Sequence, residues 1–362
     1  MFTAQKENRV FAHLDQLIQR KRVPGIQYTV IDDQDIRFEY CGGRRDISGN
    51  LPVTAETSFM ASSTTKVLTA GAVLQLIEQG KVGLDESLSD YYTTHPYGKR
   101  ITIRHLLNHT SGIPNPLPLR WLHKEEDRAF FDEDAALQNT LNEHPVLAFS
   151  PGEKYSYSNI AYWLLGKVIE ATSGLSYCDY LKQYIFAPLG ISPKELSCAI
   201  PDLAQYARGY LKRWSLLSRV LPLLMDRTLI LTANEGWTGL RPVYMNGPSY
   251  GGLIGTARGF SRFLMDQLRI KPMLFSVATK KLFFSVQRNN MGQVIETTLG
   301  WHRGRVSGML YYGQPGGGPG FQSNARIYAD KSIATVWLAN RMGIDAHTIN
   351  TLSDSLDQHF LN

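Results

Sequence analysis

The residues that most directly indicate chemistry in this sequence are a serine and a lysine three positions apart. Ser63 and Lys66 fit the pattern S-x-x-K, and no other serine in the chain has a lysine at that spacing. An apolar run begins directly after Lys66, so we expect both residues on one face at the start of a helix. A serine hydroxyl needs a base to take its proton, and a buried lysine can be that base because burial lowers its pKa. A helix N-cap beside a solvated lysine would leave the same pattern.

A tyrosine and an asparagine further along the chain could complete the proton pathway. Tyr157 and Asn159 fit Y-x-N, 94 residues after Ser63, between a Pro-Gly turn and an apolar run. A tyrosine held between the serine and the lysine could pass the proton between them, and the asparagine could hydrogen-bond the lysine or the substrate. A buried tyrosine beside an asparagine N-cap would give the same pattern.

A glycine-rich stretch near the end of the chain is the third candidate. The residues from Gln314 to Phe321 read Q-P-G-G-G-P-G-F. Glycines beside a strand let the backbone approach a ligand closely, which makes Gly316 and Gly317 candidates for substrate binding, together with Gln314. Pro315 has no N–H, so it must lie where the strand needs no donor, such as an edge that faces a cleft. An ordinary loop of glycine and proline would have the same composition.

Other motifs compete for these roles and fit them less well. Ser249 lies in G-x-S-x-G, but the nucleophile turn of α/β-hydrolases needs a buried strand before the serine and a helix directly after it. Pro248 and the two glycines after Tyr250 interrupt both. A second Y-x-N, which begins at Tyr244, lacks the turn and the helix. His109 could suggest a Ser-His triad, but it is better explained as support for the turn after a helix. No H-E-x-x-H or C-x-x-C occurs, so we expect no metal and no other cofactor.

Taken together, the three motifs resemble those of the class C β-lactamase-related serine hydrolases, which include DD-peptidases and family VIII esterases. They occur in that family's order, and the stretches 101–112 and 251–253 are also similar. The resemblance covers about residues 10 to 345. It implies a fold of two lobes with the site between them, and an oxyanion hole made by the backbone N–H groups of Ser63 and Gly317.

Two positions depart from the family pattern. Members of the family usually carry lysine or histidine where this chain has Gln314, and many carry aspartate where it has Gly259. The first difference bears on substrate recognition, because a cation there can bind a substrate carboxylate. Arg326 or another cation could replace it from a neighbouring position. The second difference is expected to be structural.

The elements that must position these residues can be predicted from hydrophobic periodicity. Predicted helices lie near residues 8–21, 64–79, 102–108, 134–143, 159–172, 177–186, 256–268 and 345–360. Predicted strands lie at 26–31 and 36–40 and again between 296 and 340, including 332–338. Strands at both ends of the chain and helices between them favour an α+β fold, in which an antiparallel sheet from both termini is flanked by terminal helices. We expect one catalytic domain over 10–345, with a sheet lobe of about 1–58 plus 256–362 and a mainly helical lobe of about 59–255.

Composition narrows the possible partners and the cell compartment. The chain has 362 residues and a formal net charge of +6, with no dense block of lysine and arginine, so we expect no nucleic-acid partner. Its three cysteines, an odd number, predict reduced and mostly buried thiols. The start of the chain has no signal-peptide pattern, and no stretch reaches the ~18 apolar residues of a membrane span. The sequence therefore favours a cytoplasmic protein. The apolar stretch from Trp214 to Leu231 is expected to pack in the core, with a lid over a lipophilic substrate or a membrane contact as alternatives.

These observations predict a serine hydrolase that cleaves a small ester or amide through an acyl-enzyme on Ser63. A carboxylesterase acting on neutral esters is the first expectation, and a β-lactamase or a D-amino-acid peptidase is the second. A catalytically silent relative that binds a ligand or a partner is a further alternative, because Gln314 could mark lost chemistry. No oligomeric state is predicted.

Overall fold

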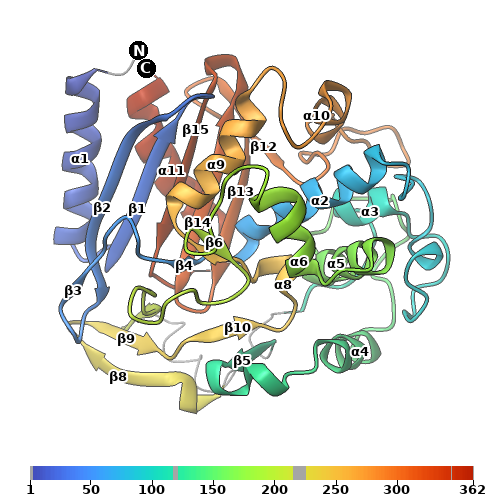
Figure 1. The fold of residues 1–362 in the computed structure, drawn as a ribbon, viewed down its shortest axis with the longest axis horizontal. Helices are drawn as coiled ribbons and strands as arrows, with labels where there is room; N and C mark the ends of the chain where they lie inside the picture. Colours follow the sequence, from blue (N-terminus) through green and yellow to red (C-terminus); the bar gives the residue numbers. More distant parts are fainter. Residues whose placement is uncertain (1–2, 117–120, 215–225, 344, 362) are drawn as a thin grey trace.

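A seven-stranded antiparallel sheet is the largest element of the computed structural model, which describes residues 3–116, 121–214, 226–343 and 345–361 (Figure 1). Its strand order is β12-β13-β14-β15-β1-β2-β3. The strands are β1 (Gly25–Ile31), β2 (Ile36–Asp46), β3 (Leu51–Pro52), β12 (His302–Val306), β13 (Met309–Gly318), β14 (Phe321–Tyr328) and β15 (Ile333–Ala339). Because β1 pairs with β15, the two ends of the chain meet in the middle of the sheet. The predicted sheet built from both termini is confirmed.

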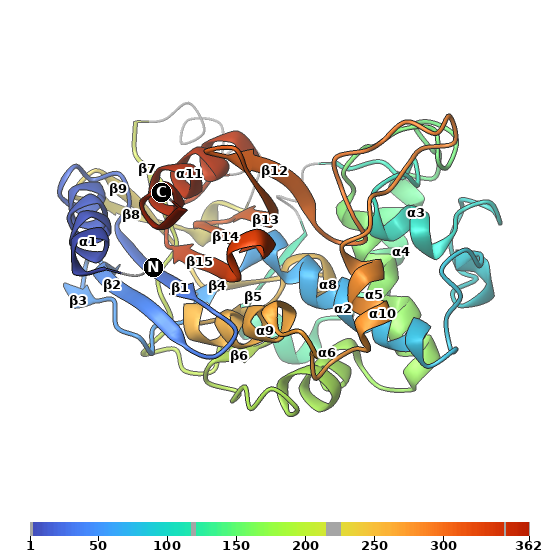
Figure 2. The ribbon, with the colours of Figure 1, turned by 90° about the horizontal axis from the view of Figure 1, so that it is seen from above.

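Helices cover both faces of this sheet. The terminal helices α1 (Ala4–Gln19) and α11 (Ala346–Leu361) pack on one face, and α9 (Ala257–Leu268) packs on the other (Figure 2). All seven residues of β1 are buried, as expected for a strand that is covered on both faces. Within the described residues, no helix is long and apolar enough to cross a bilayer.

The remaining helices lie in the segment between β3 and β12. Helix α2 (Lys66–Glu78) is at their centre and is buried for most of its length. The helices around it are α3 (Ile103–Leu107), α4 (Glu133–Glu143), α5 (Asn159–Ser173), α6 (Tyr177–Leu181), α8 (Pro248–Gly251) and, after α9, α10 (Val277–Phe283). The helix predicted over 177–186 is α6 followed by a π-helical turn, and α10 was not predicted. Helix α5 packs against α2 and α8, which places the start of α5 beside the start of α2.

The prediction that this segment is mainly helical missed three small sheets. They are β4 (Phe59–Met60) with β11 (Ile254–Gly255) and β6 (Leu196–Ser197), β5 (Leu122–Lys124) with β10 (Val243–Met245), and β7 (Tyr210–Lys212) with β9 (Trp237–Leu240) and β8 (Ile230–Asn234). Strands of this length are too short to show a two-residue period in the sequence. The first sheet fixes the chain directly before the predicted nucleophile. Most of the apolar stretch from Trp214 to Leu231 lies outside the described residues.

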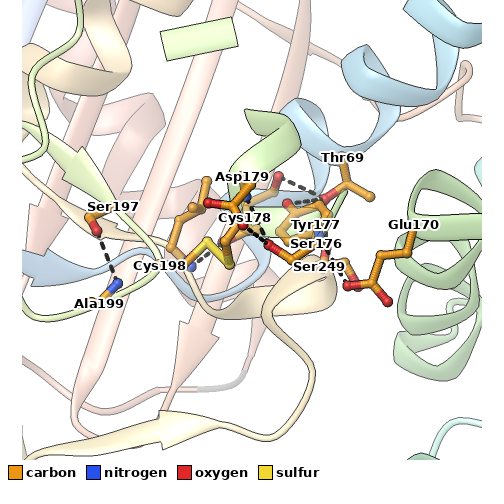
Figure 3. The surroundings of a disulfide bond; sticks show 12 residues. Thr69, Glu170, Ser176, Tyr177, Cys178, Asp179, Ser197, Cys198, Ala199 and Ser249 are labelled. Atoms are coloured by element: carbon orange, nitrogen blue, oxygen red, sulfur yellow. Dashed lines mark hydrogen bonds between the residues drawn. A yellow bond between two sulfur atoms is a disulfide. The ribbon is translucent and has the colours of Figure 1, made fainter. Parts of the chain in front are cut away.

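The cysteine prediction was wrong for two of the three thiols. Cys178 in α6 and Cys198, directly after β6, form a disulfide, and Cys41 stays free and half-buried (Figure 3). An odd number of cysteines leaves one thiol unpaired, but it does not prevent a pair elsewhere. The disulfide joins α6 to the chain after β6, and the tyrosine next to Cys178 hydrogen-bonds Thr69 of the central helix α2 at 2.7 Å. Reduced thiols are typical of cytoplasmic proteins, so the disulfide removes one argument for the expected cytoplasmic location.

Candidate active site

Ser63 lies in a 3₁₀ turn, Ser62–Thr65, that leads from β4 into α2. Two contacts hold this turn in place. The N–H of Ala61 donates to the main-chain oxygen of Leu253 at 2.8 Å, and the hydroxyl of Thr64 donates to the main-chain oxygen of Gln314 at 2.9 Å. Ser62 has a φ of +48°, a left-handed conformation that residues other than glycine rarely adopt. The nucleophile candidate is therefore fixed between the small sheet, α2 and β13.

The ammonium group of Lys66 lies next to the Ser63 hydroxyl and is completely buried. Lys66 Nζ is 3.2 Å from Ser63 Oγ, and it donates to Asn159 Oδ1 at 2.8 Å and to the main-chain oxygen of Tyr250 at 2.5 Å. All three partners are uncharged, and none of the ion pairs among the described residues involves Lys66. Burial lowers the pKa of Lys66 well below its ordinary value. A lysine in this state can hold a lone pair near neutral pH and accept a proton.

Tyr157 completes this group from the segment before α5. Its Oη donates to Ser63 Oγ at 2.7 Å, and Lys66 Nζ lies 5.0 Å from the centre of its ring. Burial raises the pKa of Tyr157, and its hydrogen bond with Ser63 only partly opposes this effect. The phenol therefore keeps its proton at neutral pH and can relay it rather than carry a lasting negative charge.

Asn159 is the first residue of α5, and the N-cap is its neighbour Ser158, whose Oγ accepts from the N–H of Ala161. The alternative in which Asn159 serves only as a helix cap is therefore wrong. Its side-chain oxygen is available to Lys66, and its own N–H donates to Asn115 Oδ1 at 3.0 Å. The asparagine holds the lysine in place without adding a charge.

The glycine-rich stretch forms the end of β13 and lies directly against the nucleophile turn. A Cβ on Gly316 would come within 2.5 Å of the main-chain oxygen of Ala61, so only glycine fits there. The pairs between β12 and β13 end at Gly313, while the pairs with β14 continue to Gly318. Pro315 and Gly317 thus lie in a part of β13 that pairs with β14 alone, at an edge next to Ser63. The role of Gly317 in an oxyanion hole stays a prediction.

Position 314 brings no charge to the site. Gln314 is buried, and its side-chain Nε2 donates to the main-chain oxygen of Pro315 at 3.2 Å. Arg326, the cation that could have replaced a lysine or histidine there, is fully buried and paired with Asp354 at 2.6 Å and Asp357 at 3.4 Å. These two aspartates pair with the charge of Arg326, so Arg326 does not replace the positive charge that is missing at position 314.

Two histidines border the site and had no predicted role in it. The ring of His109 lies 4.5 Å from that of Tyr157, and the ring of His302 lies 6.3 Å from it at a near-parallel angle. Burial and the nearby Lys66 lower the pKa of His302 to about 4. Burial lowers the pKa of His109 well below its ordinary value, and both His302 and Lys66 add to the effect. Both imidazoles are neutral at neutral pH. His302 lies opposite Gly313 in the β-ladder, a pairing that only the register reveals.

The competing motifs lie elsewhere or face inward. Ser249 is buried, and its Oγ lies 3.5 Å from the main-chain oxygen of Trp163; no described lysine or histidine hydrogen-bonds it. Tyr244 stacks on His123 and accepts the N–H of Ile200. In the part of the chain that the structure describes, no group of three or more histidine, cysteine, aspartate or glutamate side chains could hold a metal ion.

Comparisons with known proteins agree with this arrangement. A family model described as Beta-lactamase matches residues 10–356. Penicillin-binding protein 4* of Bacillus subtilis (strain 168) is 28% identical over 85% of this chain, and the chain spans 66% of that protein's length, slightly less than two thirds. Among solved structures, the D-amino acid amidase of Ochrobactrum anthropi SV3 in complex with D-phenylalanine superposes with a TM-score of 0.80 at 21% identity, over 99% of each chain.

A third similar structure is the octameric penicillin-binding protein homologue from Pyrococcus abyssi. It has a TM-score of 0.74 at 22% identity and covers 96% of this chain and 76% of its own. At these identities the solved structures show a common fold. The family match extends over nearly the whole chain, and the chain belongs to the beta-lactamase family of serine hydrolases.

Proposed function

We propose that this protein cleaves an ester or amide by a two-step reaction through an acyl-enzyme on Ser63. The observation that carries the proposal is the contact of Ser63 Oγ with both Lys66 Nζ and Tyr157 Oη, where Lys66 takes part in no ion pair among the described residues. In the first step Ser63 Oγ bonds to the substrate carbonyl carbon, and its proton passes to Lys66 directly or through Tyr157. The bond from that carbon to the leaving group breaks, and the same proton goes to the leaving oxygen or nitrogen.

In the second step water attacks the acyl-enzyme. Its proton goes to the Tyr157–Lys66 pair, its oxygen bonds to the carbonyl carbon, and Ser63 Oγ leaves with a proton from the same pair. We propose that the backbone N–H groups of Ser63 and Gly317 hold the negative oxygen that forms in both steps. The closeness of Gly316 to Ala61 supports this role, because it brings β13 against the nucleophile turn.

For the substrate we propose neutral carboxylic esters ahead of β-lactams and D-amino-acid peptides. β-Lactams and the C-terminal D-amino acids of cell-wall peptides carry a carboxylate, and position 314 offers it no charge. A hydrogen bond to a charged group contributes about 1.5–3 kcal/mol, against about 0.5–1.5 kcal/mol for a neutral pair. The pairing of Arg326 with two aspartates supports the proposal further, because it removes the cation that could have replaced Lys or His at 314.

The second candidate is hydrolysis of β-lactams or of amides and peptides of D-amino acids. The names of the similar proteins favour it, since they include a D-amino acid amidase and a penicillin-binding protein. A silent binding protein is the third candidate. The preserved contact of serine, lysine and tyrosine argues against it, because a binding function would not need a buried lysine without a counter-ion.

The test combines covalent labelling with a substrate panel. Ser63→Ala should abolish both labelling by a fluorophosphonate probe and turnover of p-nitrophenyl esters, whereas Ser249→Ala should keep most of both. The wild type should cleave the esters faster than a chromogenic cephalosporin, and Gln314→Lys should shift the ratio toward the cephalosporin. If Ser249→Ala were the inactive variant, the mechanism would be wrong. A wild type that prefers the cephalosporin would refute the substrate class alone.

A further inference from the structure

A cavity of about 410 Å³ lies on the face of the sheet opposite to Ser63, within the size range of small-molecule sites. Its walls come from the end of α1 and the turn after it, from α11, and from Gln322 of β14. Ser323, the next residue of β14, donates its hydroxyl to the main-chain oxygen of Ala61, directly before the nucleophile turn. Successive side chains of a strand point to opposite faces. Gln322 therefore points away from Ser63, toward the side that α1 and α11 cover (Figure 2).

Two arginines line this cavity without a carboxylate. They are Arg22, in the turn after α1, and Arg341, two residues after β15, and no described aspartate or glutamate lines the cavity with them. Neither guanidinium group has a hydrogen bond or an ion pair with another described residue. Arg341 is half-buried, burial lowers its pKa, and the charge of Arg22 adds to this effect. Two neighbouring cations without a counter-ion repel each other, a cost that a bound anion removes.

The carboxylate at the start of α11 does not neutralise these arginines. Asp345 accepts hydrogen bonds from the N–H groups of His347 and Thr348 and from the hydroxyl of Thr348. It therefore caps the helix, and it takes part in no ion pair among the described residues. His347 lines the cavity as well, but an imidazole is not always charged. The permanent positive charge of the cavity is that of the two arginines.

Gln322 adds a buried amide to the same cavity. The residue is only 2% exposed, and its side chain makes no hydrogen bond with another described residue. Asn324 and Arg326, the next two residues on the same face of β14, both hydrogen-bond side chains of α11. A buried amide without a partner is costly, so Gln322 favours a polar occupant of the cavity.

The lining also indicates which anion fits. Guanidinium groups bind the oxygen atoms of carboxylates and phosphates in pairs, and two of them match an anion with two charges. A phosphate monoester carries close to two negative charges at neutral pH. Leu17, Val23 and Leu352 give the cavity an apolar part, against which an apolar substituent of the ester can pack.

We propose that this cavity binds a phosphate monoester with an apolar substituent, and that the phosphate lies between Arg22 and Arg341. The inference concerns binding alone, at a site separate from Ser63, and it does not rest on the proposed hydrolase function. The same chemistry can come from a free small molecule or from a lipid headgroup such as that of phosphatidic acid.

The first test measures binding by isothermal titration calorimetry at about pH 8. Phenyl phosphate should bind more tightly than benzoate, which has one charge, and than inorganic phosphate, which has no apolar part. Arg22→Gln and Arg341→Gln should each weaken the binding of phenyl phosphate by at least about 10-fold, the scale of one hydrogen bond between charged groups. Arg20→Gln removes the same charge from an exposed residue that does not line the cavity, and should change the affinity by less than about 2-fold.

The second test fills the cavity without changing its charge. Thr351 is exposed on α11 and lines the cavity, so Thr351→Trp should weaken the binding of phenyl phosphate by at least about 10-fold. Gln358→Trp is the matched control, because it adds the same side chain to an exposed position of α11 that does not line the cavity. Its affinity for phenyl phosphate should equal that of the wild type.

The melting temperature without ligand distinguishes a binding site from a structural cluster. Because Arg22 is exposed and faces another cation, Arg22→Gln should keep or raise the melting temperature. Phenyl phosphate should raise the melting temperature of the wild type more than that of this variant. Arg22→Gln decides the test even if Arg341→Gln does not fold. A clear fall of its melting temperature without ligand would show that the arginine stabilises the fold, and the proposal would be wrong.

Vesicles identify the source of the phosphate. If it is a lipid headgroup, phosphatidylcholine vesicles that contain phosphatidic acid should bind the wild type and not Arg22→Gln. If they bind neither protein while phenyl phosphate binds the wild type, the ligand is a free small molecule. Tighter binding of benzoate than of phenyl phosphate would overturn the phosphate part of the proposal. Absence of phenyl phosphate binding at millimolar concentration, or binding that persists in both Arg22→Gln and Thr351→Trp, would overturn the site.

Discussion

Among the residues that the structure describes, two cations are completely buried, Lys66 beside Ser63 and Arg326 within the sheet, and their surroundings are opposite. Arg326 is paired with Asp354 and Asp357 and also hydrogen-bonds Tyr328. Burial alone would lower the pKa of Arg326, but the charge of Asp357 together with Tyr328 and Tyr311 outweighs burial and raises it. Lys66 contacts only neutral oxygen atoms and aromatic rings, and burial lowers its pKa.

The comparison shows that burying a positive charge has opposite consequences at the two positions. Removing a charge from water is unfavourable. At Arg326 two carboxylates offset this cost, and the charge ties β14 to α11. At Lys66 no ion pair among the described residues offsets it, so burial favours the neutral form and the lysine can act as a base. A buried cation with carboxylates is therefore structural here, and a buried cation without them is the candidate for chemistry.

The most stringent test of this comparison replaces the buried lysine by arginine and the buried arginine by lysine. Lys66→Arg keeps a positive side chain but removes the possibility of deprotonation, so kcat should fall by about 10²- to 10⁴-fold, the range of general-base catalysis. Arg326→Lys should keep kcat within a few-fold and lower the melting temperature instead. Steady-state kinetics and thermal unfolding of both variants measure the contrast. A Lys66→Arg enzyme with near-native kcat would show that residue 66 works as a fixed charge and not as a base.

The structural half of the comparison predicts a loss of stability without a loss of catalysis. Asp357→Asn removes the fully buried partner of Arg326 and should lower the free energy of unfolding by about 3 kcal/mol or more, the cost of breaking a buried pair. Asp354→Asn is the matched control, because the Asp354 side chain is 44% exposed, and should cost about 1 kcal/mol or less. Denaturant unfolding would measure both. Equal costs would mean that burial does not distinguish the two carboxylates.

On the catalytic side, Tyr157→Phe keeps the ring contact with His109 and removes only the hydroxyl. Because that hydroxyl donates to Ser63 Oγ, kcat should fall by about 10²-fold. Combined with Lys66→Ala, the loss should be smaller than the product of the single losses, since the two groups act as one unit. Tyr244→Phe is the control and should behave like the wild type. A near-native Tyr157→Phe enzyme would remove Tyr157 from the mechanism.

The parts of the site that sequence could predict are local. Ser63 and Lys66 are one turn apart, and Tyr157 and Asn159 lie on either side of the N-cap of α5, so spacing alone indicates that each pair lies close together. The partners that decide the lysine's pKa are distant, and the main-chain oxygen of Tyr250 has no side-chain signal at all. The same holds for His302, which reaches Tyr157 only through the register of β12 and β13.

The fold shows the same division between features that are local in the sequence and features that depend on distant contacts. The long strands β1 and β15 have clear patterns, and a sheet built from strands at both chain ends was predicted, although which strands pair was not. The two-residue strands β4, β6 and β11 have no periodicity to detect, although they fix the turn that carries Ser63. The bond between Cys178 and Cys198 depends on α6 and β6 meeting in space, which a count of cysteines does not reveal.

The smallest expected effect is the contribution of His302, on the catalytic side, to the dependence of stability on pH. The pKa of His302 is lowered to about 4 by burial and by Lys66, against about 6.5 in an unfolded chain. Between these two values the unfolded chain binds a proton at residue 302 and the folded protein does not. The free energy of unfolding therefore falls as the pH drops through this window, by up to about 1.4 kcal/mol per pH unit.

His302→Phe keeps an aromatic ring against Tyr157 and removes the titrating group, so unfolding between pH 4 and 6.5 should depend less steeply on pH than in the wild type. His347→Phe, on the exposed start of α11, should leave the slope unchanged. Denaturant unfolding at a series of pH values measures both slopes. If His302→Phe has the wild-type slope, His302 is protonated in the folded protein, and a positive charge then lies beside Tyr157. The surroundings of Lys66 would then carry a positive charge, where those of Arg326 carry two carboxylates, and a substrate carboxylate would find a cation beside Tyr157, which would weaken the preference for neutral esters.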